Sequence, residues 1–268
     1  MVTARIPNGW KPRASQRPLW DYLEGGGTRA IEIAHRRWGK DDVALHRCAV
    51  AALERPATYW HCLPEYEQGR RSLWTAVNPH TGKRRIDEAF PEIIRSGKDE
   101  QAMMIKLVNG STWQVIGSDR YNALVGAGVA GVTFSEWALC NPASWGYISP
   151  MLRENDGWAV FITTPRGKNH AHTMYNQFRD DPDWFAEIST VLDTGAFSNA
   201  QYEQEYMCSF EAAILGSYYG GELATARGDG RVCRVEYDDD LPVTTVWDIG
   251  YTDDTAILFV QILAGGGR

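Results

Sequence analysis

Residues 29–40 read Arg29-Ala-Ile-Glu-Ile-Ala-His-Arg-Arg-Trp-Gly-Lys40, and this stretch decides the fold. A β-like apolar run leads directly into a Gly-Lys pair, and a helical pattern follows. A strand that enters a tight turn before a helix is the layout of a loop that surrounds phosphates with backbone N–H groups, a lysine and a helix N-terminus. Gly82-Lys83 is a second such pair, but no strand precedes it. The stretch therefore predicts a phosphate-binding loop centred on Lys40.

The composition is typical of a globular chain. It has 268 residues, of which 44% are hydrophobic, and this suffices for one large core or one and a half domains. No stretch approaches the roughly 18 uninterrupted apolar residues of a membrane span, and the first residues lack the apolar block of a secretion signal. The five cysteines are scattered without a CxxC pair, which predicts reduced thiols in a cytosol and argues against a zinc site. His170 and His172 lie close together but lack partners for a metal set.

Charge is unevenly distributed along the chain. The net charge of −7 gives no overall support for a nucleic-acid binder. Residues 1–40 carry eight Lys or Arg against three Asp or Glu, whereas residues 235–256 carry seven Asp or Glu and no Lys or Arg. A basic end suits phosphate contacts and a carboxylate-rich end suits divalent metal. A solvated face explains either segment, and charge alone favours that interpretation.

Short apolar runs alternate with helical patterns, which predicts an α/β protein with a mostly parallel sheet covered by helices on both faces. We expect strands at 29–34, 57–63, 130–134, 158–163 and 185–191. We expect helices at 41–54, 65–77, 142–153, 170–179 and 199–208. Residues 103–117 predict a hairpin that turns at Asn109-Gly110.

The last part of the chain has a different character. Residues 216–240 are rich in turn-forming and acidic residues and predict a linker, after which Val243–Asp248 and Thr255–Val260 predict two strands. A segment this short cannot form a stable domain alone. We therefore expect an incomplete second domain.

Chemistry-bearing residues follow the predicted strands directly. Ligands of open α/β sheets bind beyond the carboxyl ends of the strands. Glu136 follows strand 130–134 and, beside a bound γ-phosphate, could activate the attacking water; an ordinary helix-start glutamate is the alternative. Thr163 and Thr164 end strand 158–163 and could sense the γ-phosphate through their hydroxyls. Arg166 could contact phosphate or pair with an acid, and the sequence leaves both open.

These motifs, in this order, resemble the large terminase subunit of tailed bacteriophages, a motor that pumps DNA into a prohead. The resemblance rests on Gln16, residues 36–40, Phe134-Ser-Glu-Trp137, Thr163-Thr-Pro-Arg-Gly-Lys-Asn-His170 and Asp248-Ile-Gly250. It implies a RecA-like P-loop ATPase domain over residues 1–215, a linker over 216–241 and the start of an RNase H-like nuclease domain over 242–268.

The resemblance also implies roles for individual residues. Gln16 matches the glutamine that reads adenine, a role that an amide can fill because it both donates and accepts hydrogen bonds. The resemblance assigns nucleotide binding to Gln16, Arg36, Arg37, Trp38, Gly39, Lys40 and Asp41, catalysis to Glu136, Arg37 and Thr164, and metal binding to Asp41, Ser135 and Asp248.

Two departures from the family's pattern concern the metal. Asp41 stands where a Ser or Thr usually coordinates Mg²⁺, and Ser135 stands where the expected acidic pair would begin. Our hypothesis is that Ser135 supplies the hydroxyl while Asp41 supplies the charge; Asp42 is the alternative carboxylate.

A third departure is Val125, which occupies the position where related motors often carry an arginine that acts on a neighbouring subunit. Arg120 is our candidate for that arginine, and a surface arginine is the alternative. The basic loop Asn78–Arg85 is either a DNA-phosphate contact or a solvated connector.

The resemblance implies an ATP- and Mg²⁺-dependent motor subunit in the cytoplasm of the infected bacterium. Its expected partners are double-stranded DNA, the portal protein, the small terminase subunit and other copies of itself in a ring. It also implies a nuclease with Mg²⁺ or Mn²⁺ in the complete protein. We expect no DNA cleavage by this chain, because its carboxylate cluster is limited to Asp248 together with Asp253 or Asp254.

Two alternatives stay open at this point. A helicase-like RecA-fold ATPase predicts a second RecA-like lobe after residue 215. A nucleotide-binding scaffold with a degenerate site predicts binding without turnover, and the Asp41 and Ser135 departures keep it open.

Overall fold

The computed structural model describes residue 6, residues 9–124 and 128–194, and then residues 222, 225–226, 228–234, 237–249 and 255–262. The chain separates into two compact units, residues 1–218 and residues 219–268, and each is described by itself. The predicted helix at 199–208 lies outside the described residues, as do Val125, Asp253 and Asp254.

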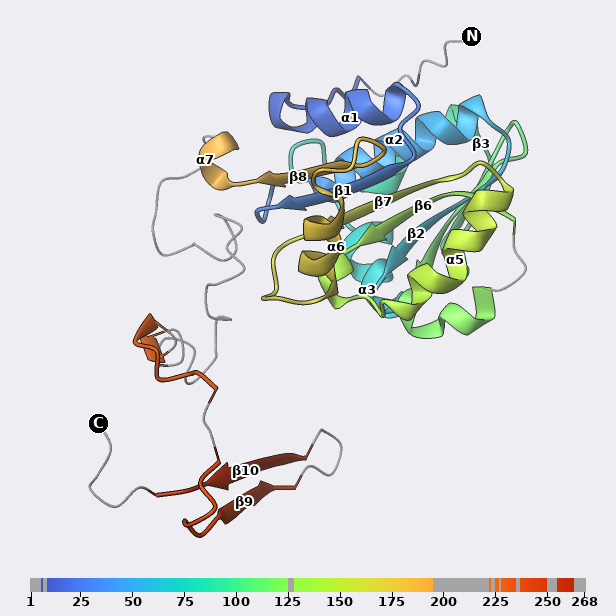
Figure 1. Cartoon of the computed structure of the whole chain (residues 1–268). Coiled ribbons are helices and arrows are strands. Elements are labelled where there is room, and N and C mark those ends of the chain that lie inside the picture. The colour runs from blue at the N-terminus through green and yellow to red at the C-terminus, as the bar shows by residue number, and fades with distance from the viewer. Residues whose placement is uncertain are drawn as a thin grey trace. The chain divides into compact units, whose positions relative to one another are not determined.

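The first unit is built on an eight-stranded sheet (Figure 1) with the order β3-β4-β5-β2-β6-β7-β1-β8. The strands are β1 (Arg29–Ala34), β2 (Thr58–Leu63), β3 (Arg95–Asp99), β4 (Met104–Leu107), β5 (Thr112–Gly117), β6 (Val129–Ser135), β7 (Trp158–Thr163) and β8 (Phe185–Ser189). The five neighbouring pairs from β5 to β8 along this order are parallel, whereas β4 is antiparallel to both β3 and β5. The predicted mostly parallel sheet is confirmed, and so is the hairpin, in which Gly110 has φ +90°.

Helices cover both faces of the sheet. They are α1 (Arg17–Glu24), α2 (Lys40–Glu54), α3 (Tyr66–Gly69), α4 (Arg85–Ala89), α5 (Ala143–Glu154), α6 (His170–Phe178) and α7 (Val191–Thr194), with shorter turns η1 (Ala14–Gln16), η3 (Glu92–Ile94), η4 (Ser118–Leu124) and η5 (Trp137–Leu139). Apolar side chains of α1, α2 and α4 pack on one face, and those of α5 and α6 pack on the other.

The prediction of one regular helix over residues 65–77 is wrong. The structure has the short helix α3 followed by a π-helical turn, η2 (Arg70–Trp74). The consecutive side chains Leu73 and Trp74 are both buried, and Trp74 stacks on Trp113 of β5 with ring centroids 6.2 Å apart. Leu73 and Trp74 belong to the same buried cluster as Trp113, so packing against the sheet accompanies this departure from a regular helix.

The topology brings the predicted site residues to one edge. Strands β6, β7 and β1 are adjacent and parallel, so the segments that follow their carboxyl ends lie side by side. This is the edge at which α/β proteins bind ligands.

The second unit contains two antiparallel strands, β9 (Thr244–Asp248) and β10 (Ala256–Val260), in which Asp248 pairs with Ala256. Both predicted strands are confirmed, and their side chains are exposed. Residues 222, 225–226 and 228, in the predicted linker, are helical. The assignment to an RNase H-like domain and the boundaries 1–215, 216–241 and 242–268 stay predictions.

The described cysteines Cys48, Cys62, Cys140 and Cys233 are free thiols, and the first three are buried. Among the described residues, no helix is both long enough and apolar enough to cross a membrane.

Candidate active site

The loop after β1 has the conformation that a phosphate cradle needs. Arg37 has φ +65° and Gly39 has φ +86°, so the chain turns tightly before α2 begins at Lys40. A Cβ atom at Gly39 would meet the tips of the Arg13 and Gln16 side chains. Because these tips are flexible, it is the left-handed backbone that favours glycine here. Trp38 is 1% exposed and packs among apolar side chains of α1 and α2. Its side chain therefore anchors the loop rather than facing a ligand.

Gln16 fastens the loop from outside. Its Nε2 donates to the carbonyls of Trp38 at 3.0 Å and Gly39 at 3.3 Å, and its Oε1 accepts from the backbone N–H of Arg13 at 2.9 Å. The Arg13 guanidinium also donates to the Trp38 carbonyl. Both ends of the Gln16 amide are thus engaged with the protein, and in this conformation Gln16 positions the loop.

The Lys40 ammonium links the loop to the end of β7. It donates to the carbonyls of Ala34 at 3.0 Å and His35 at 3.3 Å, and to Thr164 Oγ1 at 2.9 Å. The side chain is nearly buried, at 7% exposed. Lys40 and Thr164, which are 124 residues apart in the sequence, therefore meet in one site.

Asp41 connects the start of α2 to two strands below it. Its Oδ1 accepts the Ser135 hydroxyl at 2.6 Å and lies 3.3 Å from His61 Nε2. Burial opposes ionisation of Asp41, but the hydrogen bond and charge of His61, together with the Ser135 hydroxyl, outweigh it and lower the pKa to about 2. Asp41 is therefore a carboxylate at neutral pH, and the two departures seen in the sequence touch each other.

Sequence reasoning missed His61. This histidine is fully buried in β2, within the run that predicted a strand at 57–63. A histidine in an apolar strand gives no sequence signal for a role, since only the fold brings it beneath Asp41.

Glu136 directly follows β6 in a left-handed conformation, with φ +52°. Such a backbone is uncommon for a residue other than glycine and recurs at functional sites. Burial raises the pKa of the Glu136 carboxyl, and so does Asp41, whereas Lys40, Arg166 and Arg36 lower it. Glu136 starts a single 3₁₀ turn, η5, instead of the ordinary helix that was the alternative.

The segment 163–170 holds the Glu136 turn in place at three points. Thr163 Oγ1 accepts from the backbone N–H of Ala138 at 3.1 Å, and Asn169 Nδ2 donates to the Ala138 carbonyl at 3.2 Å. His170 Nε2 lies 2.6 Å from the Trp137 carbonyl. The segment that ends β7 therefore contacts Lys40 through Thr164 and the Glu136 turn through its neighbours.

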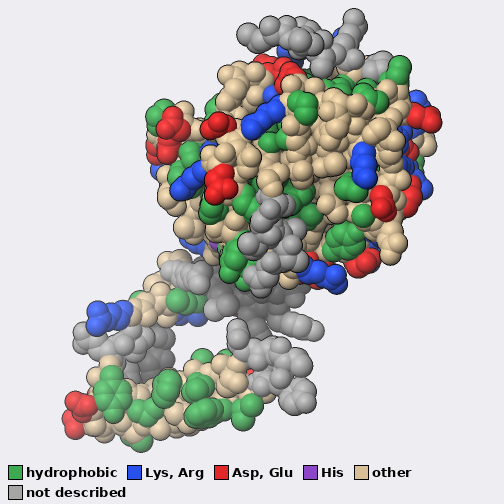
Figure 2. Space-filling view, turned by 90° about the vertical axis from the view of Figure 1, so that its right-hand side faces the viewer, with side chains coloured by type: hydrophobic (Ala, Val, Ile, Leu, Met, Phe, Trp, Pro, Cys, Tyr) green, Lys and Arg blue, Asp and Glu red, His purple; other side chains and the backbone are tan. Residues whose placement is uncertain are grey.

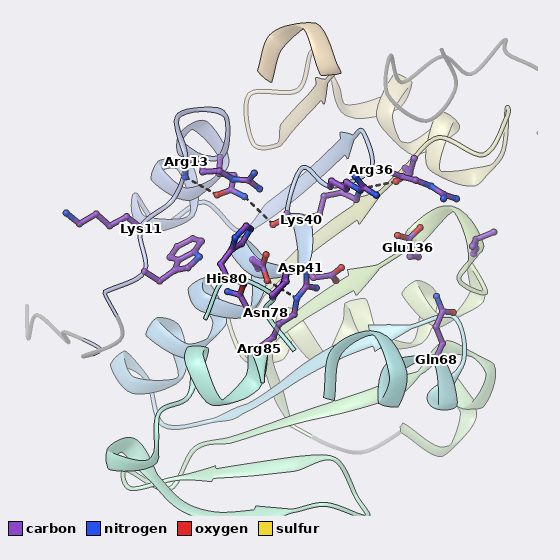
Figure 3. A pocket seen from close by; sticks show the side chains of 18 of the residues that line it. Lys11, Arg13, Arg36, Lys40, Asp41, Gln68, Asn78, His80, Arg85 and Glu136 are labelled. Carbon is purple, nitrogen blue, oxygen red and sulfur yellow. Dashed lines mark hydrogen bonds and ion pairs between the residues drawn. The ribbon is translucent and has the colours of Figure 1, made fainter. Parts of the chain in front are cut away.

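Lys40, Glu136 and Thr164 border a cavity of about 980 Å³ (Figure 3). Its lining includes most of the predicted site and several residues that the sequence did not indicate. The lining residues are Trp10, Lys11, Arg13, Gln16, Arg36, Arg37, Gly39, Lys40, Asp41, Asp42, Gln68, Asn78, Pro79, His80, Arg85, Glu136, Leu139, Thr164 and Arg166. Seven are Lys or Arg and three are Asp or Glu, so the cavity suits a highly charged anion.

Two predicted residues stand in distinct positions around this cavity. Ser135 is 2% exposed and donates its hydroxyl to Asp41 instead of facing the cavity. Arg166 lines the cavity, and its buried Nε has no hydrogen-bond partner among the described residues. Because Arg166 lines the cavity, the phosphate contact that the sequence left open stays a prediction.

The two ends of the basic loop Asn78–Arg85 line the cavity, through Asn78, Pro79, His80 and Arg85. Asn78 accepts the backbone N–H of His80 at 3.0 Å and donates to Glu88 at 2.9 Å, and the Thr81 hydroxyl donates to the same Glu88 carboxylate. These bonds give the loop a defined shape. The sequence left a DNA-phosphate contact and a solvated connector open for this loop. Neither interpretation included a contribution to this cavity.

Within the described residues, no group of three or more His, Cys, Asp or Glu side chains is arranged to hold a metal ion. Mg²⁺ needs no such cage, because it keeps several waters and binds one or two carboxylates together with substrate phosphates. The ionised Asp41 fits that requirement. Asp248 ends β9 in the second unit and is exposed, so its metal role stays a prediction.

Arg120 lies on the surface in η4. Its side chain is 77% exposed and pairs with Asp119 at 3.8 Å. Its action on a neighbouring subunit stays a prediction.

The sheet order, the glycine-lysine loop after β1 and the acidic residue after β6 together define a RecA-like α/β fold. No protein-family model matches the chain.

Among individual proteins, the chain is similar to large terminase subunits of bacteriophages. It is 26% identical over 188 residues to the terminase large subunit of Escherichia phage T5, a match that covers 62% of this chain and 42% of that protein. The match thus spans less than half the length of this relative.

Solved structures of the same kind share the fold. A mutant of the large terminase ATPase domain of Thermus phage P74-26 gives a TM-score of 0.55 at 19% identity, over 75% of this chain and all of that one. The large terminase of another thermophilic bacteriophage, in complex with ADP, gives a TM-score of 0.61 at 14% identity, over 95% of this chain and 66% of that one.

Proposed function

We propose that this chain is an ATP-hydrolysing subunit of a viral DNA-packaging motor, of the large terminase kind. The observation that carries the proposal is the convergence of Lys40, Glu136 and Thr164 on one cation-lined cavity from three adjacent parallel strands. The likeness to the T5 protein and to terminase ATPase domains supports it.

Nucleotide binding would use the charges of the loop. Phosphates would lie at the N-terminus of α2, where Lys40, Arg36 and Arg37 donate to them. The Lys40 ammonium already contacts two carbonyls and a hydroxyl, so a phosphate oxygen would replace one of these partners. Trp10 and Gln16 line the same cavity, and an apolar ring suits the nucleotide base. To read the base, the Gln16 amide would exchange its contacts with Arg13 and the loop carbonyls for the adenine edge.

Hydrolysis would depend on Glu136 as the group that orients the attacking water. Phosphoryl transfer needs positioning and charge neutralisation more than covalent chemistry. Burial raises the pKa of Glu136, which brings this carboxyl closer to the range in which it can accept a proton. Arg37 and Arg166 would stabilise charge on the transferred phosphoryl group.

Asp41 would hold Mg²⁺, directly or through water, with Ser135 and His61 orienting its carboxylate. The ion supplies neutralisation of phosphate charge when bound. Asp42 is the alternative carboxylate.

Loss of the γ-phosphate would be passed on through Thr164. This hydroxyl contacts Lys40, and the segment that it begins leads to α6 and holds the Glu136 turn. A change at the phosphate would therefore alter the contacts of both α6 and the Glu136 turn.

The activities of the whole protein are part of the same proposal. They are translocation of double-stranded DNA into a prohead, assembly with the portal protein and the small terminase subunit in a homo-oligomeric ring, and genome cutting by a Mg²⁺- or Mn²⁺-dependent nuclease in the complete protein, in the cytoplasm of the infected host. The nuclease domain would begin in residues 242–268 with Asp248, and this chain alone would not cut DNA.

The first test is thermal unfolding with Mg²⁺ and a non-hydrolysable ATP analogue, in the wild type and in Lys40→Ala. A ligand at about 100 times its dissociation constant stabilises the protein by roughly 2.7 kcal/mol. We expect a stabilised wild type and a loss of that shift in Lys40→Ala. No shift in either protein would contradict the proposal. A shift without turnover in the assembled ring would instead support a nucleotide-binding scaffold.

A further inference from the structure

Arg85 enters the cavity from outside the loops that follow the parallel strands. It is the first residue of α4, and its backbone N–H donates to the Ala76 carbonyl at 2.9 Å. Ile86 and Ala89 of the same helix are fully buried. The base of the Arg85 side chain is therefore fixed, and Figure 3 shows the side chain close to Asp41.

The guanidinium of Arg85 is held by a weak partner. Its Nε lies 3.3 Å from Asp42 Oδ1, and the two side chains are 30% and 34% exposed. Ion pairs at this exposure contribute little to stability. A phosphate presents several acceptor oxygens that match the fork of a guanidinium, and it forms the stronger pair. The contact with Asp42 is therefore one that a bound phosphate can replace.

The first turn of α2 carries negative charge that the Arg85 guanidinium can balance. Asp41 and Asp42 place two carboxylates at the helix N-terminus, where a phosphate-binding loop otherwise offers a neutral hydroxyl after its lysine. Like charges disfavour a phosphate at this position. Arg85 lies beside both carboxylates and contributes to the charge balance of each.

We propose that Arg85 is a phosphate-contacting residue of the nucleotide site, and that its guanidinium exchanges Asp42 for the phosphates when a nucleoside triphosphate binds. This inference rests on the proposed function of the cavity. The inference adds Arg85, from α4 of the same chain, to the cationic side chains of the loop after β1.

The test is a double-mutant cycle on nucleotide affinity, measured by calorimetry with Mg²⁺ and a non-hydrolysable ATP analogue. The variants are Arg85→Ala, Asp42→Asn and the double variant. Lys83→Ala is the matched control, because Lys83 is an exposed cation of the same loop and lies outside the cavity lining. Thermal unfolding without ligand verifies that each variant is folded, and Arg85→Lys replaces Arg85→Ala if the alanine variant is not.

A direct contact predicts that Arg85→Ala weakens binding by roughly 10- to 100-fold, and that Asp42→Asn does not restore it. Lys83→Ala should bind like the wild type. Recovery of wild-type affinity in the double variant would overturn the inference, because Arg85 would then act only by neutralising Asp42. Wild-type affinity in Arg85→Ala would also overturn it while leaving the proposed function intact. Absence of binding in the wild type would remove both.

Discussion

At the residue scale, Asp41 links three elements of the first unit. Its Oδ1 receives the Ser135 hydroxyl and faces the buried His61, so one carboxylate joins α2 to β6 and β2. An aspartate next to the phosphate-loop lysine would be poorly placed if it faced the phosphates alone. Because its inner oxygen is bound by the sheet, Asp41 has a fixed orientation, which a group that holds Mg²⁺ requires.

This arrangement predicts a pH dependence of stability. The folded-state pKa of Asp41 is about 2, below its usual value of 3.8, so its contribution is present above about pH 4 and is lost as the pH falls toward 2. We expect Asp41→Asn to be less stable than the wild type by roughly 2 kcal/mol at pH 7. The difference should shrink below pH 4, as measured by urea unfolding.

The neighbouring carboxyl supplies the control. Burial raises the pKa of Asp42, and Arg85 only partly offsets this. Ionisation of Asp42 therefore costs stability as the pH rises past its ordinary pKa, and Asp42→Asn should be neutral or stabilising at pH 7. Equal losses for the two variants would contradict the assigned environments.

At the scale of elements, the sequence pattern predicted the buried parallel strands, because their apolar runs are local features of the chain. Strands β1 and β7 were predicted with their observed bounds, because continuous apolar runs identify buried parallel strands. The positions of Lys40, Glu136 and Thr164 followed from the rule that ligands bind after such strands.

What the sequence did not reveal depends on contacts between distant segments. Helix α4 and strand β3 are short and polar in part, and packing on α2 and β4 determines them. Arg85 and His61 reach the site from elements whose own sequences carry no motif. The left-handed backbone of Glu136 also has no sequence signature.

The motif that follows β7 predicts a separation of binding from turnover. His170 holds the Trp137 carbonyl from the first position of α6 and is not among the residues that line the cavity. We expect His170→Ala to lower ATP turnover by roughly 10- to 100-fold, because a misplaced catalytic carboxylate is costly, while nucleotide affinity stays unchanged. His172→Ala, two residues further along α6, is the matched control. Equal turnover in the two variants would argue against a positioning role for His170.

For the whole molecule, the two units differ in how their apolar side chains are covered. The first has buried clusters on both faces of its sheet. In the second, Trp247, Leu258 and Phe259 are 58%, 62% and 73% exposed, and Figure 2 shows hydrophobic side chains along the two-stranded ladder. A ladder of two strands is marginally stable by itself, and exposed apolar surface promotes association.

Because all the described residues that line the cavity belong to the first unit, we expect a chain of residues 1–218 to keep the nucleotide site. We expect it to show the same thermal shift with Mg²⁺ and the ATP analogue as the 268-residue chain, and to associate less at high protein concentration in sedimentation experiments. Lys40→Ala in the shorter chain should abolish the shift and leave association unchanged. Loss of the shift on shortening alone would mean that residues 219–268 support the site, and the division into two independent units would then be wrong.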